Sequence, residues 1–370
     1  MLVGPFPPTK GGVTTFMLNL MASPLREKYD FVPFTTSRPP KKNVSDNYGY
    51  AAMFRGGIGR LIVGVLVTLW HLILFPWSIM RQRIDVVQIQ SSDFQTFWES
   101  CLYSWMARRF GKPVFMRLGG AFNIFYESSS DRAKRLIVKG VMAPDRLIVQ
   151  SEYWRDYLAG LGRTDGVIVL SNSVPESSVV AAEPARNDRP VCLFVIGNES
   201  VRKGAETFIQ ALEMESVKST NVQFHCIAVP PDVEGKLSAL GYGSRMRTEG
   251  FIDHDALIRA MRAADFFLLP SFGEGFPNSL LEAMAAGLAP VVTPVGAVPE
   301  IVTDGENAIV MPPGDAAALA NAINRLAGDQ EYRFQMAQNA QERLQQAYLA
   351  HVVLERLARG YEEMKGAKQA

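Results

Sequence analysis

The stretch that decides the fold runs from Ser271 to Glu300 and reads SFGEGFPNSLLEAMAAGLAPVVTPVGAVPE. It follows the apolar run FFLLP, which has the length and composition of a buried strand. Glu274 lies in a glycine-bounded loop directly after that run, and Glu282 lies in the first turns of the next predicted helix. A loop and a helix that follow one strand can bring both carboxylates to the same end of a sheet, where they can accept hydrogen bonds from ligand hydroxyls.

Two glutamates at this spacing are usually solvated, but the residues around them favour a ligand site. Glycines on both sides of Glu274 allow backbone amides to approach a ligand closely. At the helix start, Ser279 and Leu280 are expected to offer free N–H groups, which suit a diphosphate. Asn278 is expected to cap this helix and Gly287 to end it. The stretch therefore predicts a site for an anionic ligand that carries hydroxyl groups.

The same order of strand, turn and helix recurs around this stretch. Residues 191–197 form a predicted strand, and Arg202 and Lys203 follow in the turn before a helix at 204–214. Basic side chains at the carboxyl end of a strand suit a diphosphate. Alternating strands and helices predict a parallel, doubly wound sheet. Its other expected strands are 222–229, 266–270, 289–293 and 308–310, and its other expected helices are 255–264, 279–286, 315–328 and 331–347.

A second series of the same kind lies in the first half of the chain. Its expected strands are 85–90, 113–117, 146–150 and 167–170, with helices at 94–110 and 130–141. Residues 174–190 are rich in Pro, Ser, Ala and charge, which is typical of a linker. We therefore predict an α/β protein with Rossmann-like domains at 1–175 and 176–345, and a C-terminal helix at 346–370 that packs back on the first domain.

Composition excludes several classes of function. The chain has 38 basic and 37 acidic residues, so it lacks the basic excess of a nucleic-acid-binding protein. Cys101, Cys192 and Cys226 are too far apart for a disulfide framework or a zinc site, and such sparse use indicates a reducing cytoplasm. The four histidines form no metal-ligand pattern.

Residues 61–80 form an uncharged run that is long enough for a membrane-spanning helix. Basic residues flank both ends and Phe75-Pro76 interrupts the run, so a span is the least favoured interpretation. A second interpretation is a helix that packs on the sheet and keeps one apolar face free to lie on a bilayer. A third is plain burial. We expect a cytoplasmic protein, and the second interpretation adds peripheral contact with the inner membrane face.

The chain resembles the family-4 retaining glycosyltransferases of the GT-B fold. The resemblance is dense from Val191 to Gly328 and looser before that, and it implies two Rossmann-like domains that face each other across a cleft. Its carriers are the E-x7-E element from Glu274 to Glu282 with its continuation to Gly287, then 290–292, 296–302 and 305–308, the Lys203-Gly204 pair, Gly250-Phe251-Ile252, and Pro7–Val13.

This resemblance implies a role for most of the candidate residues. Glu282 would hold the nucleotide ribose, and Glu274 would face the transferred sugar. Lys203 would neutralise the diphosphate. The resemblance also implies that no metal and no cofactor is needed, because helix N-termini and basic side chains carry the charge of the leaving group. The other donor-side positions would be Gly12 of the first domain for the diphosphate, Phe251 and Ile252 for the base, and the backbone of Phe276, Pro277 and Asn278 for the sugar.

Two positions depart from the family pattern. The family usually has an arginine directly after the glycine that ends the first strand of the second domain, where this chain has Asn198. Arg202 is our candidate for the missing charge. The family also often carries a histidine in the first domain, which the matching stretch 117–123 lacks. Arg117 and Asn123 are therefore the candidates for the acceptor side.

The predicted reaction is transfer of a hexose-type residue from a UDP- or GDP-sugar to an acceptor hydroxyl, with retention at the anomeric carbon. The acceptor would be a glycan or a lipid-linked group, in polysaccharide or glycolipid biosynthesis. Two alternatives stay open. One is a phosphorylase or epimerase of the same fold. The other is a catalytically degenerate family member that binds a nucleotide sugar without turnover.

Overall fold

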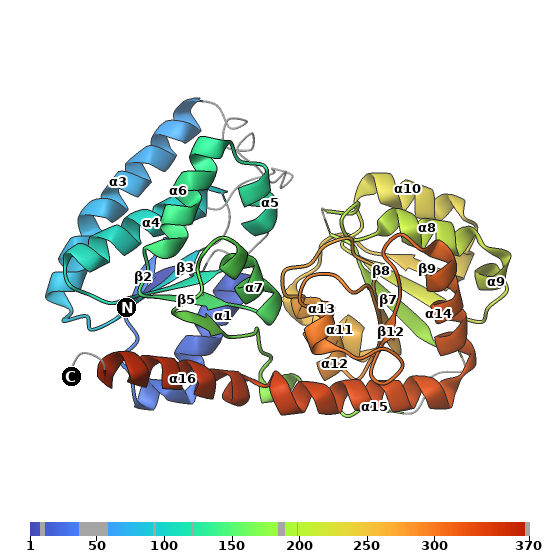
Figure 1. Ribbon diagram of the computed structural model, residues 1–370. Coiled ribbons are helices and arrows are strands. Elements are labelled where there is room, and N and C mark those ends of the chain that lie inside the picture. Colours follow the sequence, from blue (N-terminus) through green and yellow to red (C-terminus); the bar gives the residue numbers. More distant parts are fainter. Residues whose placement is uncertain are drawn as a thin grey trace. The chain divides into compact units, whose positions relative to one another are not determined.

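The computed structural model describes residues 1–7, 12–36, 58–91, 94–119, 122–183, 189–197 and 199–366. The chain divides into two compact units (Figure 1). Unit 1 combines Met1–Ser171 with Val353–Ala370, and unit 2 is Asn172–Val352. Each unit contains a six-stranded parallel sheet, which confirms the predicted α/β class with two Rossmann-like halves.

The sheet of unit 1 has the strand order β2-β1-β3-β4-β5-β6, and all its neighbouring strands are parallel. The residues of β3 and β4 are buried throughout, as expected for central strands covered on both faces. All four strands expected in the first half of the chain exist, and β1 is a short first strand that ends before Pro5, where the sequence indicates a strand end followed by a loop. The sequence did not predict β2. The strands are β1 (Leu2–Gly4), β2 (Pro33–Thr35), β3 (Val87–Ser91), β4 (Val114–Leu118), β5 (Arg146–Val149) and β6 (Val167–Val169).

Helices cover both faces of this sheet (Figure 1). The face of the sheet that α1 and α16 cover includes Phe115. Its ring centroid lies 5.4 Å from that of Tyr361. The Tyr361 hydroxyl also donates a hydrogen bond to Gln88 of β3, so α16 packs on this sheet. The helices are α1 (Gly12–Ala22), the 3-10 helix η1 (Pro24–Glu27), α3 (Ile58–Arg81), α4 (Phe94–Arg109), α5 (Phe122–Glu127), α6 (Asp131–Met142), α7 (Glu152–Gly160) and α16 (Ala350–Gly366).

The long apolar run of the sequence lies in α3, which continues through Pro76 rather than stopping there. Phe75 and Ile79 are buried in a core that α3 shares with the sheet and α4. On the opposite side, α3 exposes half or more of five apolar side chains, so the described part of α3 is not fully buried. Among the described residues, we find no helix long and apolar enough to cross a membrane. The five exposed side chains are Leu69, Trp70, Ile73, Trp77 and Met80.

The sheet of unit 2 has the strand order β12-β11-β10-β7-β8-β9 and is also parallel. Its strand order reverses direction at the β7–β10 pair, and crevices beside such points are where ligands bind in open α/β sheets. The sequence did not predict the short strand β9. The strands are β7 (Val191–Val195), β8 (Gln223–Ile227), β9 (Met246–Thr248), β10 (Phe266–Leu269), β11 (Ala289–Val292) and β12 (Ile309–Val310).

Two apolar cores, one on each face, hold this sheet between its helices. One contains side chains of α8, α10 and α14, and the other contains side chains of α11, α12 and α13. The helices are the 3-10 helices η2 (Glu176–Ser178) and η3 (Gly243–Arg245), and α8 (Ala205–Glu213), α9 (Glu215–Lys218), α10 (Pro231–Ala239), α11 (His254–Arg262), α12 (Asn278–Ala285), α13 (Val298–Ile301), α14 (Ala316–Gly328) and α15 (Gln330–Ala347).

The helix ends show where local patterns predict structure and where they do not. Gly287 follows α12 with φ of +77°, which fits its predicted role as the helix terminator. Asp315 caps α14 by accepting a hydrogen bond from the Ala318 N–H. The prediction that Asn278 caps α12 is wrong. Asn278 is the first helical residue, and its side chain accepts a hydrogen bond from the Asn172 amide group at 2.6 Å instead.

The predicted boundaries lie close to those of the two units but differ from them. The sequence placed the first boundary after residue 175 and the second after residue 345, whereas unit 2 runs from Asn172 to Val352. The difference has a physical reason. Val174 pairs with the chain around Leu349, because its N–H donates to Tyr348 and its carbonyl accepts from Ala350. These bonds keep both segments within unit 2.

Candidate active site

The candidate site of unit 2 lies at the carboxyl edge of its sheet, in the segments that follow β7 and β10. Parallel strands end at the same edge, so these segments bring distant parts of the sequence together. The turn after β7 carries Arg202 and Lys203, and the loop after β10 carries Ser271 and Glu274. The backbone N–H of Phe272 donates to the carbonyl of Arg202 at 2.7 Å, which joins the turn to the loop.

The carboxylate of Glu274 is the centre of this edge. Its side chain is only 6% exposed, and Lys203 Nζ lies 2.8 Å from Oε1. The Ser271 hydroxyl donates to the same oxygen at 2.7 Å, and Arg202 Nη1 lies 3.5 Å from Oε2. A buried carboxylate needs such compensation, because burying an unpaired charge costs far more than burying a paired one. Lys203 and Glu274 therefore meet where the sequence predicted.

Arg202 has its own set of partners. Its guanidinium donates to the Glu199 carboxylate and to the carbonyl of Gly273, besides the contact with Glu274. Burial alone would lower the pKa of Arg202, but the hydrogen bonds and charges of Glu199 and Glu274 outweigh it and raise that pKa above its ordinary value. The guanidinium thus joins the turn after β7 to the loop after β10 and braces Glu274.

Two glycines allow these loops to pack this closely. Gly204 has φ of +78°, and a Cβ atom built there would lie 2.0 Å from the Pro270 carbonyl oxygen. Gly296 has φ of +57°, and a Cβ atom there would lie 1.8 Å from the Glu274 carbonyl oxygen. Only glycine adopts such angles without strain and leaves room for the neighbouring backbone. The position of Glu274 therefore depends on a glycine that lies more than 20 residues further along the chain.

Glu282, the second predicted carboxylate, lies on α12 and is 18% exposed. Its Oε1 lies 3.1 Å from Nε2 of His254, the first residue of α11. The hydrogen bond to Glu282 raises the pKa of His254 above its ordinary value. The sequence did not suggest this pair. The one signal that could have indicated it is the position of His254 directly after the helix cap Asp253, at the carboxyl edge.

The start of α12 differs in part from the prediction. The Leu280 N–H is not free, because it donates to the Pro277 carbonyl at 3.2 Å within the first turn. The predicted free N–H of Leu280 is therefore wrong, and Ser279 lies one position earlier in the same helix. Phe276 is buried, with its ring centroid 6.0 Å from that of Tyr348, and anchors the loop below the helix.

The remaining donor-side candidates lie on separate loops. Phe251 follows β9 and is largely exposed, whereas Ile252 packs against the core beneath α11. Asn198 lies outside the described residues. Gly12 is the first residue of α1 in unit 1.

A segment of unit 2 matches a known protein family. Residues 189–329, which include every unit 2 residue of the site, match the model described as glycosyl transferases group 1. This segment of the chain is similar to that family. A solved structure of Anabaena Alr3699/HepE in complex with UDP has the same fold, with a TM-score of 0.73 at 17% identity over 98% of this chain and 99% of that one. The fold is GT-B.

Two curated proteins are similar to parts of this chain. The alpha-D-kanosaminyltransferase of Streptomyces kanamyceticus is 31% identical over 42% of this chain and 40% of that protein. The phosphatidyl-myo-inositol mannosyltransferase of Mycolicibacterium smegmatis is 26% identical over 66% of this chain and 65% of that protein. The match thus spans about two fifths of the first relative and just under two thirds of the second.

The acceptor-side candidates Arg117 and Asn123 lie in unit 1. Arg117 is in the middle of the sheet on β4 and is buried, and its guanidinium lies 4.0 Å from the ring centroid of Phe16. Burial lowers the pKa of Arg117 to about 10. Asn123 lies in the first turn of α5 and is half-buried. Arg117 therefore contacts the interior of unit 1, whereas Asn123 is partly accessible.

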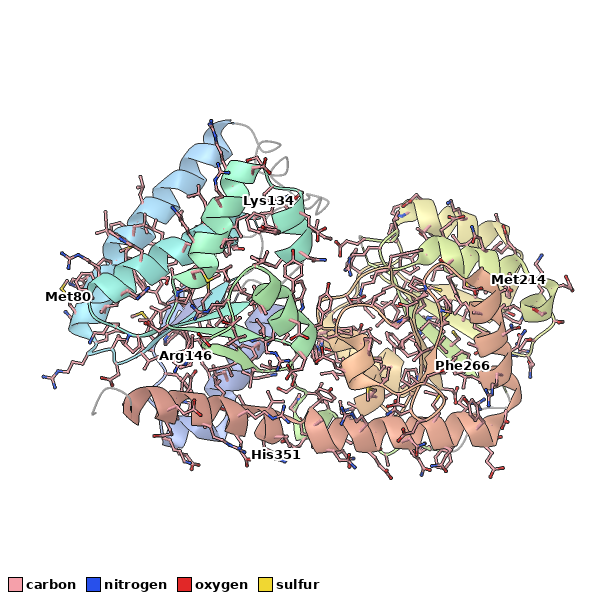
Figure 2. All side chains as sticks on the ribbon, viewed as in Figure 1. Met80, Lys134, Arg146, Met214, Phe266 and His351 are labelled. Atoms are coloured by element: carbon pink, nitrogen blue, oxygen red, sulfur yellow. The ribbon has the colours of Figure 1, made fainter. Side chains whose placement is uncertain are left out.

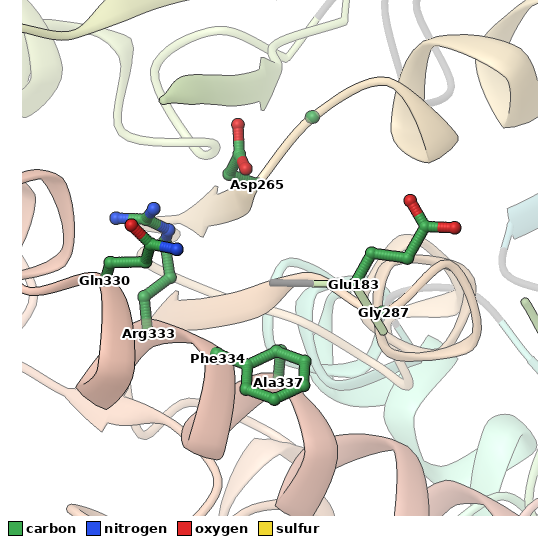
Figure 3. Close-up of a pocket in the computed structure, with 8 residues that line it drawn as sticks. Glu183, Asp265, Gly287, Gln330, Arg333, Phe334 and Ala337 are labelled. Atoms are coloured by element: carbon green, nitrogen blue, oxygen red, sulfur yellow. The ribbon is translucent and has the colours of Figure 1, made fainter. Parts of the chain in front are cut away.

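A pocket at the opposite edge of the unit 2 sheet is separate from this site (Figure 3). Its Asp265 precedes β10 and accepts a hydrogen bond from the Val191 N–H at 2.8 Å, and its Arg333 donates to the Leu326 carbonyl. Both polar groups therefore tie the ends of strands and helices together. No group of three or more metal-ligating side chains occurs among the residues that the structure describes. The other residues of the pocket are Glu183, Ala264, Gly287, Gln330, Phe334 and Ala337.

Proposed function

We propose that the protein transfers a sugar from a UDP- or GDP-sugar to an acceptor hydroxyl, with retention at the anomeric carbon. The observation that carries this proposal is the Lys203–Glu274 pair at the carboxyl edge of the unit 2 sheet, with Glu282 on the helix that follows the Glu274 loop, within the segment that matches the family. The two curated relatives described above bear the names of a mannosyltransferase and a kanosaminyltransferase, and the HepE structure holds UDP.

In the proposed reaction, the protein positions its substrates and stabilises charge. Lys203 and the N-terminal end of α12 would face the diphosphate of the donor, where negative charge grows as the bond to the sugar breaks. Glu274 would accept hydrogen bonds from the sugar hydroxyls, and Arg202 would keep its carboxylate in place. An oxygen of the leaving diphosphate would take the proton of the incoming hydroxyl. Positioning of the donor and the acceptor would then account for much of the rate enhancement. The proposed reaction requires no metal ion.

Nucleotide binding measured by calorimetry tests the donor side of the proposal. UDP, GDP and ADP are titrated into the wild type, Glu282→Ala, and the control Glu206→Ala, which removes an exposed glutamate on α8. We expect one nucleotide to bind the wild type and the control with micromolar affinity. Glu282→Ala should weaken binding about tenfold or more, roughly 1.4 kcal/mol. A folded wild type that binds none of the three would refute the proposed function. Binding without transfer would support the degenerate-member alternative.

We propose a lipid-linked acceptor at the inner membrane face, because α3 offers a surface suited to a bilayer. Its outer face consists of Leu69, Trp70, Ile73, Trp77 and Met80, and Figure 2 labels Met80 near the C-terminal end of the helix. The Arg81 guanidinium lies 5.0 Å from the Trp77 ring centroid, and Arg83 follows α3. Tryptophan rings with basic neighbours suit the interface of an anionic membrane.

Binding to lipid vesicles tests this surface. A variant with Trp70→Gln, Ile73→Gln and Trp77→Gln should lose about tenfold or more of its affinity for phosphatidylglycerol vesicles, because it loses most of the apolar area available for insertion. Leu136→Gln, which changes one exposed leucine of α6, should bind like the wild type. Vesicle sedimentation measures both. A wild type that stays in the supernatant with these vesicles would rule out the peripheral contact. Leu72 also lies on α3, but it packs against the core and is left unchanged in this variant.

A further inference from the structure

His254 contacts the candidate site, although the sequence did not assign it there. Its Nε2 lies 3.1 Å from Glu282 Oε1, and it forms the one side-chain hydrogen bond of Glu282 among the described residues. The Glu282 side chain is 18% exposed and that of His254 is 58% exposed, so the pair lies at the rim of the candidate site. An accessible imidazole thus contacts a carboxylate that is mostly shielded from water.

The backbone around His254 is held in place by its neighbours. Asp253 caps α11, with its carboxylate accepting from the Ala256 N–H at 2.7 Å. Ile252 packs against the core beneath α11, and the Gly250 carbonyl accepts from the Ala228 N–H at 3.2 Å at the end of β8. The backbone on both sides of His254 is therefore anchored, and this places the imidazole at the start of α11 beside Glu282.

A carboxylate can accept hydrogen bonds from His254 and from a ligand at the same time. Its two oxygens offer about four lone-pair sites, so one hydrogen bond from an imidazole leaves room for two from a vicinal diol. Fixing one oxygen in advance also reduces the conformational freedom that the carboxylate would lose on binding. The imidazole therefore assists recognition of a diol by Glu282 and does not compete with it.

We propose that His254 is a positioning residue for the donor nucleotide, which orients the Glu282 carboxylate toward the ribose diol. This role rests on the proposed function, because it needs a nucleotide as ligand. It assigns His254 a part in donor affinity and leaves the chemical step to Lys203 and Glu274. The expected effect is accordingly on the Kd and KM of the donor, with little change in kcat.

The protonation state of the imidazole makes the donor affinity depend on pH, which gives a second measurement of the role of His254. The charged groups that face His254 are Glu282 on α12 and Asp255 on α11, with Asp253 beside it, and its pKa is raised chiefly by the hydrogen bond to Glu282. A charge-assisted hydrogen bond is stronger than a neutral one. Orientation of Glu282 is therefore strongest while His254 is protonated, below that pKa, and weakens as pH rises through it.

Donor binding by variants of His254 tests the proposal, with the UDP- or GDP-sugar whose nucleotide binds the wild type. His254→Ala should weaken binding about three- to tenfold, the size expected for one lost hydrogen bond. His254→Gln keeps a donor at this position and should recover most of the affinity. The control His351→Ala removes an exposed histidine that lies 2.5 Å from Glu176, and it should bind like the wild type.

Two comparisons separate positioning from a general structural effect. In a Glu282→Ala background, His254→Ala should change the affinity by less than about twofold, because the two residues act as one unit. The affinity ratio of wild type to His254→Gln should fall as pH rises through the pKa of His254, which the hydrogen bond to Glu282 raises, and this ratio cancels the titration of the ligand. Normal binding by His254→Ala, or an equal loss in the Glu282→Ala background, would overturn the inference while the proposed function stands. A wild type that binds no donor would overturn both.

Discussion

Replacing Lys203 with alanine is expected to lower kcat/KM for sugar transfer by a factor of about 10²–10³, the usual loss when one preorganised donor is removed from a site of developing charge. The Lys203 side chain is 19% exposed and lies 2.8 Å from a carboxylate that is 6% exposed, so water screens its charge poorly. The variant also leaves Glu274 with less compensation for its burial. Initial rates with the donor identified by calorimetry measure the effect, and thermal unfolding separates it from loss of fold.

The chain offers a matched control for this prediction. Lys236 lies 2.8 Å from Glu206, the same separation as in the Lys203–Glu274 pair, but both partners are more than half exposed. An exposed pair contributes little to stability, and Lys236 lies on α10, which is not one of the elements that carry the site residues. Lys236→Ala should therefore keep the wild-type rate and unfolding temperature. If a folded Lys203→Ala enzyme also kept its rate, Lys203 would have no part in stabilising the leaving group.

The strands of both sheets could be predicted because buried parallel strands are short apolar runs separated by helices. The runs at 113–117 and 266–270 lie within one residue of β4 (Val114–Leu118) and β10 (Phe266–Leu269). The strands that the sequence did not suggest, β2 (Pro33–Thr35) and β9 (Met246–Thr248), are short edge strands with exposed residues. An edge strand has neighbours on one side only, so it leaves a weaker apolar pattern.

The site could be predicted in part for a related reason. Lys203 and Glu274 each follow a central strand, and the topology of a parallel sheet brings such residues to one edge. The contacts of Arg202 with Glu199 and Gly273, and of His254 with Glu282, depend on side-chain rotamers and on how α11 packs against α12. No periodicity in the sequence encodes these details. The prediction of a free N–H at Leu280 is wrong for a similar reason, because that N–H donates to the Pro277 carbonyl within the first turn of α12.

Replacing Gly296 with alanine is expected to destabilise the protein by about 2–5 kcal/mol and to remove most of the transfer activity. The new methyl group would lie 1.8 Å from the carbonyl oxygen of Glu274, a distance that no relaxation of a side chain can relieve. The loop that carries Glu274 would have to move, and a displacement of about 1 Å at a reacting centre can cost roughly a hundredfold in rate. Chemical denaturation and initial rates measure the two effects.

Gly305 provides the control that separates backbone strain from the steric clash. Its φ is +73°, in the same left-handed region as Gly296, but a Cβ atom there would contact nothing within 4 Å. Gly305→Ala should therefore cost only the strain of a left-handed alanine, about 1 kcal/mol, and leave activity unchanged. The difference between the two variants measures how tightly the loop around Glu274 is packed. Equal stability and equal activity in both would mean that this loop moves freely, and that the preorganised carboxylate on which the proposed mechanism depends does not exist.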